Sequence, residues 1–156
     1  MSHYDLDVLI PPTPEPMVPL TRADMDRKLD EHFAYEASDD VEGVLDTLAA
    51  DVEHDVVGAP TGPTGRDGAR DFYEGLFADL SDGTFTTIRR LYGEDFIVDE
   101  SHWRGTASGK PFGLDGRDRP LEFRLLHVMQ FTADGDIGRE NVWVDRAAII
   151  AQLPQD

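Results

Sequence analysis

Residues 121–153, LEFRLLHVMQFTADGDIGRENVWVDRAAIIAQL, decide the fold. Two runs of alternating apolar residues flank Ala133-Asp134-Gly135-Asp136, and a turn that contains Asp-Gly between such runs predicts a β-hairpin. The turn fits either a two-residue primed loop or a three-residue loop with Gly135 in the left-handed conformation. A short amphipathic segment after the second run predicts a final helix.

The loop length determines which side chains meet across the hairpin. The three-residue loop brings more apolar side chains together than the two-residue loop does, so we predict its register. The opposed pairs in this register are Phe131 with Ile137, Leu125 with Trp143, and His127 with Asn141.

One face of this hairpin combines polar and apolar side chains, because side chains alternate between the two faces of a strand. It carries Phe123, Leu125, His127, Met129, Phe131, Ile137, Arg139, Asn141, Trp143 and Asp145. A few polar groups among apolar ones are typical of a small-molecule pocket. A face that packs in the core, with a histidine hydrogen-bonded to a neighbouring residue, has the same pattern. For a single histidine this is the commoner case.

Length and composition narrow the classes of protein. A chain of 156 residues is expected to form one domain. The absence of cysteine excludes disulfides and cysteine-based metal sites. We expect a cytoplasmic protein without a membrane partner, because no apolar run has spanning length and no secretory signal is recognisable. The formal net charge of −18 disfavours nucleic acid as a partner, since phosphates would be repelled. An acidic, lysine-poor surface also fits a high-salt cytoplasm or a biased genome.

The order of elements along the chain predicts the fold class. Residues 1–19 are proline-rich and are expected to form an extended tail, and residues 20–156 the domain. Helices are predicted at about 21–37, 41–48 and 67–80, and strands before the hairpin at about 51–58, 84–92 and 96–106. This order favours an α+β domain in which the helices cover one face of a curved, mainly antiparallel sheet.

Several short motifs also follow one another in a particular order. They are Gly65-Arg66-Asp67-Gly68 with Phe72-Tyr73 and Leu76-Phe77, Trp103-Arg104-Gly105-Thr106 with Gly109 and Gly113, His127 to Phe131 with Asp134-Gly135, Asn141-Val142-Trp143 with Asp145, and Gln152-Leu153. Together they resemble the SnoaL-like polyketide cyclases of the nuclear-transport-factor-2-like superfamily, which includes ketosteroid isomerase. The resemblance covers roughly residues 25–153.

The resemblance implies a cone-shaped α+β barrel around an apolar cavity, assembled as a homodimer through sheet faces. In the cyclase branch an aspartate with a nearby histidine closes a ring by acid–base chemistry, without cofactor or metal. A carboxylate suits this role in an apolar cavity, because desolvation raises its pKa toward neutrality. The same architecture also serves isomerases, dehydratases, epoxide hydrolases and binding proteins without activity.

The candidate catalytic residues are His127, Asn141 and Asp145. His127 matches the histidine strand of the cyclases, but the chain departs from their pattern at Asn141, where a carboxylate is expected. In the predicted register, Asn141 stands opposite His127 and cannot transfer a proton, so Asp145 is the nearest carboxylate. Either Asp145 is the base with His127, or His127 is the base with Asn141 as an oxyanion donor, or the pocket binds without reacting. Asp145 also precedes the final helix, and we favour capping over catalysis for it.

The expected ligand is a small hydrophobic carbonyl compound. The candidate ligand-binding residues are Phe33, Tyr73, Phe77, Trp103, Leu125, Met129 and Trp143, with core packing as the alternative for Tyr73. No metal is expected, because the residues of Glu53-His54-Asp55 alternate between faces of a strand. Epoxide-hydrolase chemistry ranks lower, since it needs two aspartates bridged by an arginine and only Arg139 and Asp145 are available.

Overall fold

Ten short elements make up the described part of the chain. The computed structural model describes residues 20–59 and 64–153, so the predicted tail at 1–19 lies outside the described residues. The helices are α1 (Arg22–Ala37), α2 (Val41–Asp46), α3 (Gly65–Asp79) and α4 (Arg146–Gln152), with one 3₁₀ turn at Pro111–Gly113. The strands are β1 (Leu48–Val56), β2 (Leu80–Tyr92), β3 (Phe96–Ala107), β4 (Arg119–Phe131) and β5 (Ile137–Val144).

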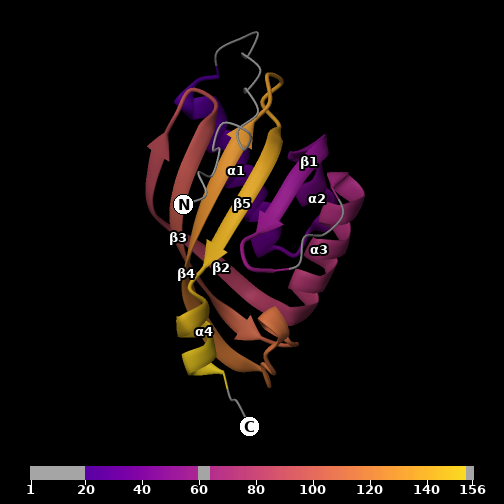
Figure 1. Cartoon of the computed structure of the whole chain (residues 1–156), viewed down its shortest axis with the longest axis vertical. Helices are drawn as coiled ribbons and strands as arrows, with labels where there is room; N and C mark the ends of the chain where they lie inside the picture. The colour runs from indigo at the N-terminus through magenta and orange to yellow at the C-terminus, as the bar shows by residue number, and fades with distance from the viewer. Residues whose placement is uncertain (1–19, 60–63, 154–156) are drawn as a thin grey trace, which may run out of the picture.

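The five strands form one curved sheet in the order β1-β5-β4-β3-β2. The pair β1–β5 is parallel and the other pairs are antiparallel. Helix α1 lies behind the long strands, α3 runs beside β1, and α4 lies at the opposite end, below β4 and β5 (Figure 1). The predicted α+β class is confirmed, with an open sheet in place of a closed barrel, because the edge strands β1 and β2 do not pair with each other.

Local capping explains where three helices begin. Thr21 and Asp24 form a capping box at α1, in which each side chain accepts from the backbone N–H of the other. The Asp40 carboxylate accepts from Gly43 N at 2.9 Å at the start of α2. The Asp145 carboxylate accepts from Ala148 N at 3.0 Å at the start of α4. These caps satisfy backbone donors that a helix leaves free at its first turn.

The hairpin begins in the predicted register and then leaves it. Gly135 has φ +85°, as the three-residue loop requires, and Phe131 pairs with Ile137. At the next pair Gln130 stands opposite Arg139, so β5 contains one extra residue, Gly138. Glycine within a strand is typical of such a β-bulge.

The bulge makes the predicted register wrong for the rest of the hairpin. His127 pairs with Val142 in place of Asn141, and Leu125 with Val144 in place of Trp143. A shift of one residue moves every following side chain to the other face of its strand. Glu140 is therefore buried on the inner face, while Trp143 is 42% exposed on the outer face.

The hydrophobic core has two parts. One lies under α1, α2 and α3 and includes Met25, Leu29, Phe33, Leu48, Tyr73, Ile97 and Met129. The other lies at the α4 end and includes Trp103, Leu121, Phe123, Leu125 and Ile149. Leu76 and Phe85 pack against both parts, so they lie where the two parts meet.

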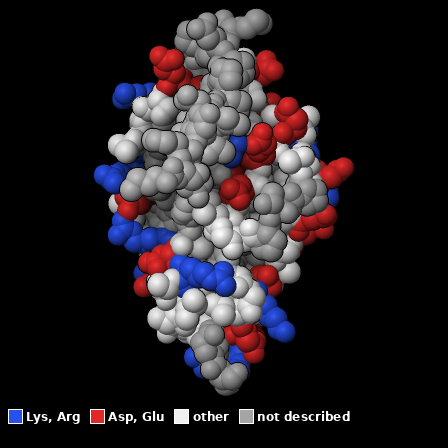
Figure 2. Space-filling view, viewed as in Figure 1, with Lys and Arg blue, Asp and Glu red and all other residues white. Residues whose placement is uncertain are grey.

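The described surface is strongly acidic. Figure 2 shows several acidic side chains along the side where α2 and α3 lie. Among the helices described, none combines the length and the apolar character needed to cross a membrane.

Candidate functional site

A pocket with a cavity volume of about 60 Å³ lies on the inner face of the sheet. Most of its wall is apolar: Val56, Phe72, Leu76, Phe77, Leu80, Phe85, Trp103, Phe112, Phe123, Leu125, Val142 and Val144. Its polar side chains are those of Glu36, Asp39, His54, Tyr73, His127 and Glu140. An apolar wall with a few polar groups suits a small hydrophobic molecule that has a polar end.

The structure brings five of the predicted site residues to this pocket. They are Tyr73, Phe77, Trp103, Leu125 and His127. Phe33 and Met129 are buried in the neighbouring core, with the Phe33 ring centroid 5.0 Å from that of His127. These two side chains therefore support the pocket from behind without lining it.

The other three predicted residues are separated from His127. The Asn141 side chain accepts from Arg139 at 2.7 Å and donates to Asp55 at 3.1 Å. Trp143 is exposed on the outer face, and the Asp145 carboxylate caps α4. The bulge at Gly138 explains why Asn141 and Trp143 do not reach the pocket, because it turns their side chains away from the inner face.

Four polar residues of the site were missed by the sequence reasoning: His32, Glu36, His54 and Glu140. His32 and Glu36 are spaced by four on α1, which places them on one face of the helix. His54 stands directly opposite Glu140 across the β1–β5 pair. The helical spacing of the first two was a usable signal, whereas Glu140 could be placed only by recognising Gly138 as a bulge.

Tyr73, His32 and the two glutamates form a buried hydrogen-bonded cluster. The Tyr73 hydroxyl donates to Glu140 Oε2 at 2.9 Å and lies 3.4 Å from Glu36 Oε1. His32 Nε2 lies 2.8 Å from Glu36 Oε1 and 3.6 Å from Glu140 Oε2. The two carboxylates are thus bridged by one imidazole and one phenol.

Two further histidines approach Glu140 from neighbouring strands. His54 Nε2 is 3.7 Å from Glu140 Oε2, and His127 Nε2 is 4.0 Å from Glu140 Oε1. Within the described residues, His54 Nε2 and His127 Nδ1 are buried without a hydrogen-bond partner. Buried polar atoms without partners are rare, and a catalytic role or a bound ion is among the reasons for them.

Burial and charge set different protonation states for these groups. Burial lowers the pKa of His32, but Glu140 and Glu36 outweigh it and raise that pKa to about 10. Burial raises the pKa of Glu140, but His54, His32 and His127 together bring it well below its usual value. Burial also lowers the pKa of His127, against the opposing effect of Glu140. At neutral pH, His32 is therefore a cation, Glu140 an anion and His127 neutral.

This arrangement can move a proton. A neutral imidazole in an apolar pocket can accept a proton from a bound molecule, and the resulting imidazolium is stabilised by the negative charge of Glu140. Burial raises the pKa of Tyr73 well above 10, and Glu140 and Glu36 add to this effect. The phenol therefore stays protonated and remains a hydrogen-bond donor.

Comparison with solved structures supports the fold. TsrD from Streptomyces laurentii is similar with a TM-score of 0.75 and 18% identity, over 85% of this chain and 96% of that one. A SnoaL-like polyketide cyclase from Agrobacterium tumefaciens is similar with a TM-score of 0.69 and 20% identity, over 82% and 96%. SalBIII, described as an epoxide hydrolase/cyclase-like enzyme in pyran ring formation in salinomycin, has a TM-score of 0.68 and 15% identity, over 81% and 94%.

Comparison at the level of sequence identifies the family. None of the curated proteins matches this chain. The family model for SnoaL-like polyketide cyclases matches residues 23–153, which include every described helix and strand except the first residue of α1. The protein therefore belongs to the SnoaL-like polyketide cyclase family.

Proposed function

We propose that this protein is an acid–base enzyme of the cyclase or isomerase type, without an organic cofactor, that acts on a small hydrophobic carbonyl compound. One observation carries the proposal: His127 and Glu140 lie at the polar end of an apolar pocket, 4.0 Å apart. The candidate catalytic residues are therefore His127 and Glu140, with Glu140 in place of Asn141 and Asp145. In this set His127 transfers the proton and Glu140 stabilises its charged form.

The chemistry begins with a carbonyl compound whose apolar part lies against the aromatic wall. His127 removes a proton from the carbon next to the carbonyl, which leaves an enolate and an imidazolium. The enolate carbon attacks a second carbonyl carbon in ring closure, or is protonated at another position in isomerisation. In either case the imidazolium returns its proton to the product, so the enzyme ends in its starting state.

Hydrogen exchange tests this step without knowledge of the natural substrate. The protein is incubated in D₂O with small ketones such as cyclohexanone and acetophenone, and deuterium uptake at the α-carbon is measured by mass spectrometry. We expect H127Q to lower the rate by about 10²–10⁴-fold, the usual contribution of a general acid–base group. H102Q is the matched control, because His102 lies beside Glu122 outside the pocket.

The outcomes separate an enzyme from a binding module. Equal exchange rates for wild type and H127Q would contradict the role of His127. If ketones shift the NMR signals of the pocket residues but do not exchange faster than in buffer, the protein is a non-catalytic binder of hydrophobic ligands. Such binding is the main alternative.

Epoxide opening is a second candidate because of the bridge between Glu36 and Glu140. Two carboxylates bridged by a cation are the arrangement this chemistry needs, and here the cationic His32 takes the bridging position. One carboxylate would remove a proton from water or a substrate hydroxyl, whose oxygen then attacks the epoxide carbon as the ring C–O bond breaks. The carboxylic acid formed in this way then returns the proton to the freed ring oxygen. Turnover of styrene oxide that is lost in E36Q but kept in H127Q would favour this candidate.

We also propose a homodimer through the outer face of the sheet. The exposed Trp143 lies opposite the half-buried Leu126 on this face. An exposed tryptophan beside other apolar side chains is typical of an interface. Light scattering on wild type and W143R tests it: the wild type should have the mass of two chains and the variant the mass of one, whereas a monomeric wild type would contradict the proposal.

A further inference from the structure

Four nitrogen and oxygen donors from distant parts of the chain converge at the buried end of the pocket. His32 and Glu36 come from α1, His54 from β1 and Glu140 from β5. His32 Nε2 and one carboxylate oxygen from each glutamate lie within 4.8 Å of one another. Glu36, His54 and Glu140 line the pocket, so the cluster can be reached by a small ion or molecule.

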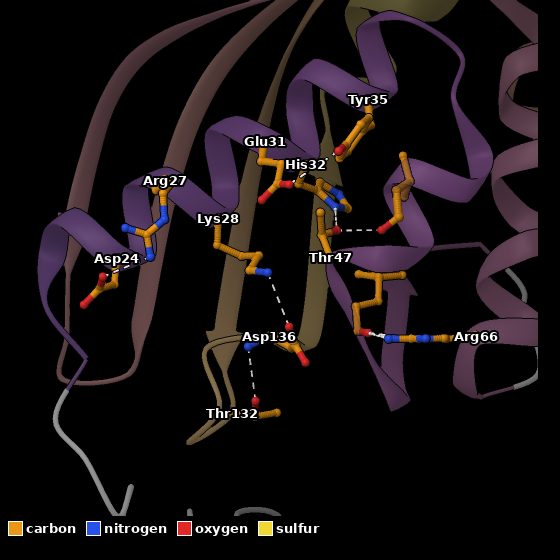
Figure 3. A network of polar contacts seen from close by, with 12 residues as sticks. Asp24, Arg27, Lys28, Glu31, His32, Tyr35, Thr47, Arg66, Thr132 and Asp136 are labelled. Carbon is orange, nitrogen blue, oxygen red and sulfur yellow. Dashed lines mark hydrogen bonds and ion pairs between the residues drawn. The ribbon is translucent and has the colours of Figure 1, made fainter.

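The orientation of His32 follows from its contact with Thr47. The Thr47 hydroxyl donates its hydrogen to Val44 O at 2.6 Å, so it can only accept from His32 Nδ1, 2.7 Å away (Figure 3). Nδ1 therefore carries a hydrogen, and Nε2 is the atom that faces the two carboxylates. A histidine held through Nδ1–H by an oxygen acceptor is oriented as metal-ligating histidines are.

The spacing of the donors fits a small metal ion. Ligands about 2.0–2.1 Å from a tetrahedral zinc ion are about 3.3 Å from one another. His32 Nε2 is 2.8 Å from Glu36 Oε1 and 3.6 Å from Glu140 Oε2, and His54 Nε2 is 3.7 Å from Glu140 Oε2. The first two separations lie on either side of the tetrahedral value, so small shifts bring His32, Glu36 and Glu140 onto one ion. His54 lies outside this group of three and is close to Glu140 alone, so its ring must move further inward to complete the site.

His54 supplies an independent observation. Its side chain is only 8% exposed, and among the described residues Nε2 has no hydrogen-bond partner. A buried polar atom without a partner costs free energy, so it calls for a ligand. Nε2 faces Glu140, the residue directly opposite on β5.

We propose that His32, Glu36, His54 and Glu140 bind one divalent transition-metal ion of the Zn²⁺ class. Two imidazoles and two carboxylates suit Zn²⁺, Co²⁺ or Mn²⁺ better than Ca²⁺ or Mg²⁺, which prefer oxygen ligands. Two carboxylates also balance the charge of a divalent ion, which matters for a buried site. The ion takes the place of the proton on His32 Nε2. The proposal shares Glu140 with the proposed function but gives no role to His127.

This site was not expected from the sequence, which directed attention to Glu53-His54-Asp55. The structure confirms that neighbouring side chains of this strand diverge: Glu53 pairs with Arg139, and Asp55 accepts from Asn141. His54 alone of the three faces the pocket. Its partners come from α1 and β5, which local spacing cannot reveal.

Metal content tests the proposal directly. The untagged full-length protein is loaded with Zn²⁺, dialysed against metal-free buffer and analysed by elemental mass spectrometry. Affinities for Zn²⁺, Co²⁺ and Mg²⁺ are measured by calorimetry. We expect one Zn²⁺ per chain, the visible absorption bands of four-coordinate Co²⁺, and no saturable binding of Mg²⁺.

Variants of the proposed ligands and of residues outside the site should differ in zinc binding. H54Q should weaken Zn²⁺ binding at least tenfold and remove the Co²⁺ bands, whereas H102Q and E53Q should bind as the wild type does. E140Q should also lose binding, and H54Q carries the test if E140Q does not fold. Equal zinc content in wild type and H54Q, or no zinc in the folded wild type, would overturn the proposal. H127Q should retain zinc, so failure here is distinguishable from failure of the ketone-exchange test.

Discussion

Arg90 and Arg89 allow the stability contribution of a buried arginine with several carboxylate partners to be compared with that of an exposed arginine with one. Both lie on β2 and both contact an acidic residue of β3. The Arg90 side chain is 10% exposed and lies 2.8 Å from Asp99, which is fully buried. It also lies 2.8 Å from Asp26 and 2.7 Å from Asp30 of α1. The Arg89 side chain is 67% exposed and lies 2.9 Å from Glu100.

We predict that R90M is far more destabilising than R89M. Methionine keeps much of the apolar stem but removes the charge, which leaves Asp99 buried without its cation. Loss of one partner of a buried pair costs about 3–5 kcal/mol, whereas an exposed pair contributes about 0–1 kcal/mol. For a domain of this size the melting temperature should fall by roughly 6–20 °C in R90M and by less than about 4 °C in R89M.

Urea denaturation followed by circular dichroism measures both free energies of unfolding. The two variants change the net charge equally, so general repulsion in this acidic protein cancels in the comparison. R90M/D99N should recover part of the loss, because it removes the unpaired charge as well. A similar loss in R90M and R89M would refute the argument that the buried cluster around Arg90 contributes more than the exposed pair of Arg89.

Three further predictions concern single groups. D145A should lower the free energy of unfolding by about 1 kcal/mol while D145S retains it, because serine also caps a helix; thermal denaturation compares them, and equal losses would contradict capping. Y73F should lower the free energy of unfolding by about 1.5–3 kcal/mol, because the buried Glu140 carboxylate loses the hydrogen bond that the Tyr73 hydroxyl donates. An unchanged urea midpoint would contradict a stabilising role for this hydrogen bond. Burial and the nearby Asp82 raise the pKa of Asp39, so its ionisation opposes folding as pH rises through that pKa. D39N should therefore be more stable than wild type at pH 7 and gain less at pH 3.5, and a gain that is equal at both values would contradict this reasoning.

Local features of the chain were sufficient to predict the elements. The capping box at Thr21, the cap at Asp145 and the left-handed Gly135 each act within a few residues, so their effects can be read without knowledge of the rest of the fold. The alternation of apolar residues on β4 likewise placed His127 on the inner face. Fold class and family followed from these local features and their order.

The composition of the site depended on contacts between distant segments. The register of β5 changes at Gly138, and the change places Glu140 rather than Asn141 on the inner face. The inward orientation of Glu140 is stabilised by Tyr73 from α3 and by His32 and His54 near the carboxylate. The sequence by itself determined where helices, strands and the turn form, because those preferences act over a few residues. Only the tertiary structure decided which side chains meet at the pocket, because a shift of one residue in a strand costs little locally and reverses the faces throughout.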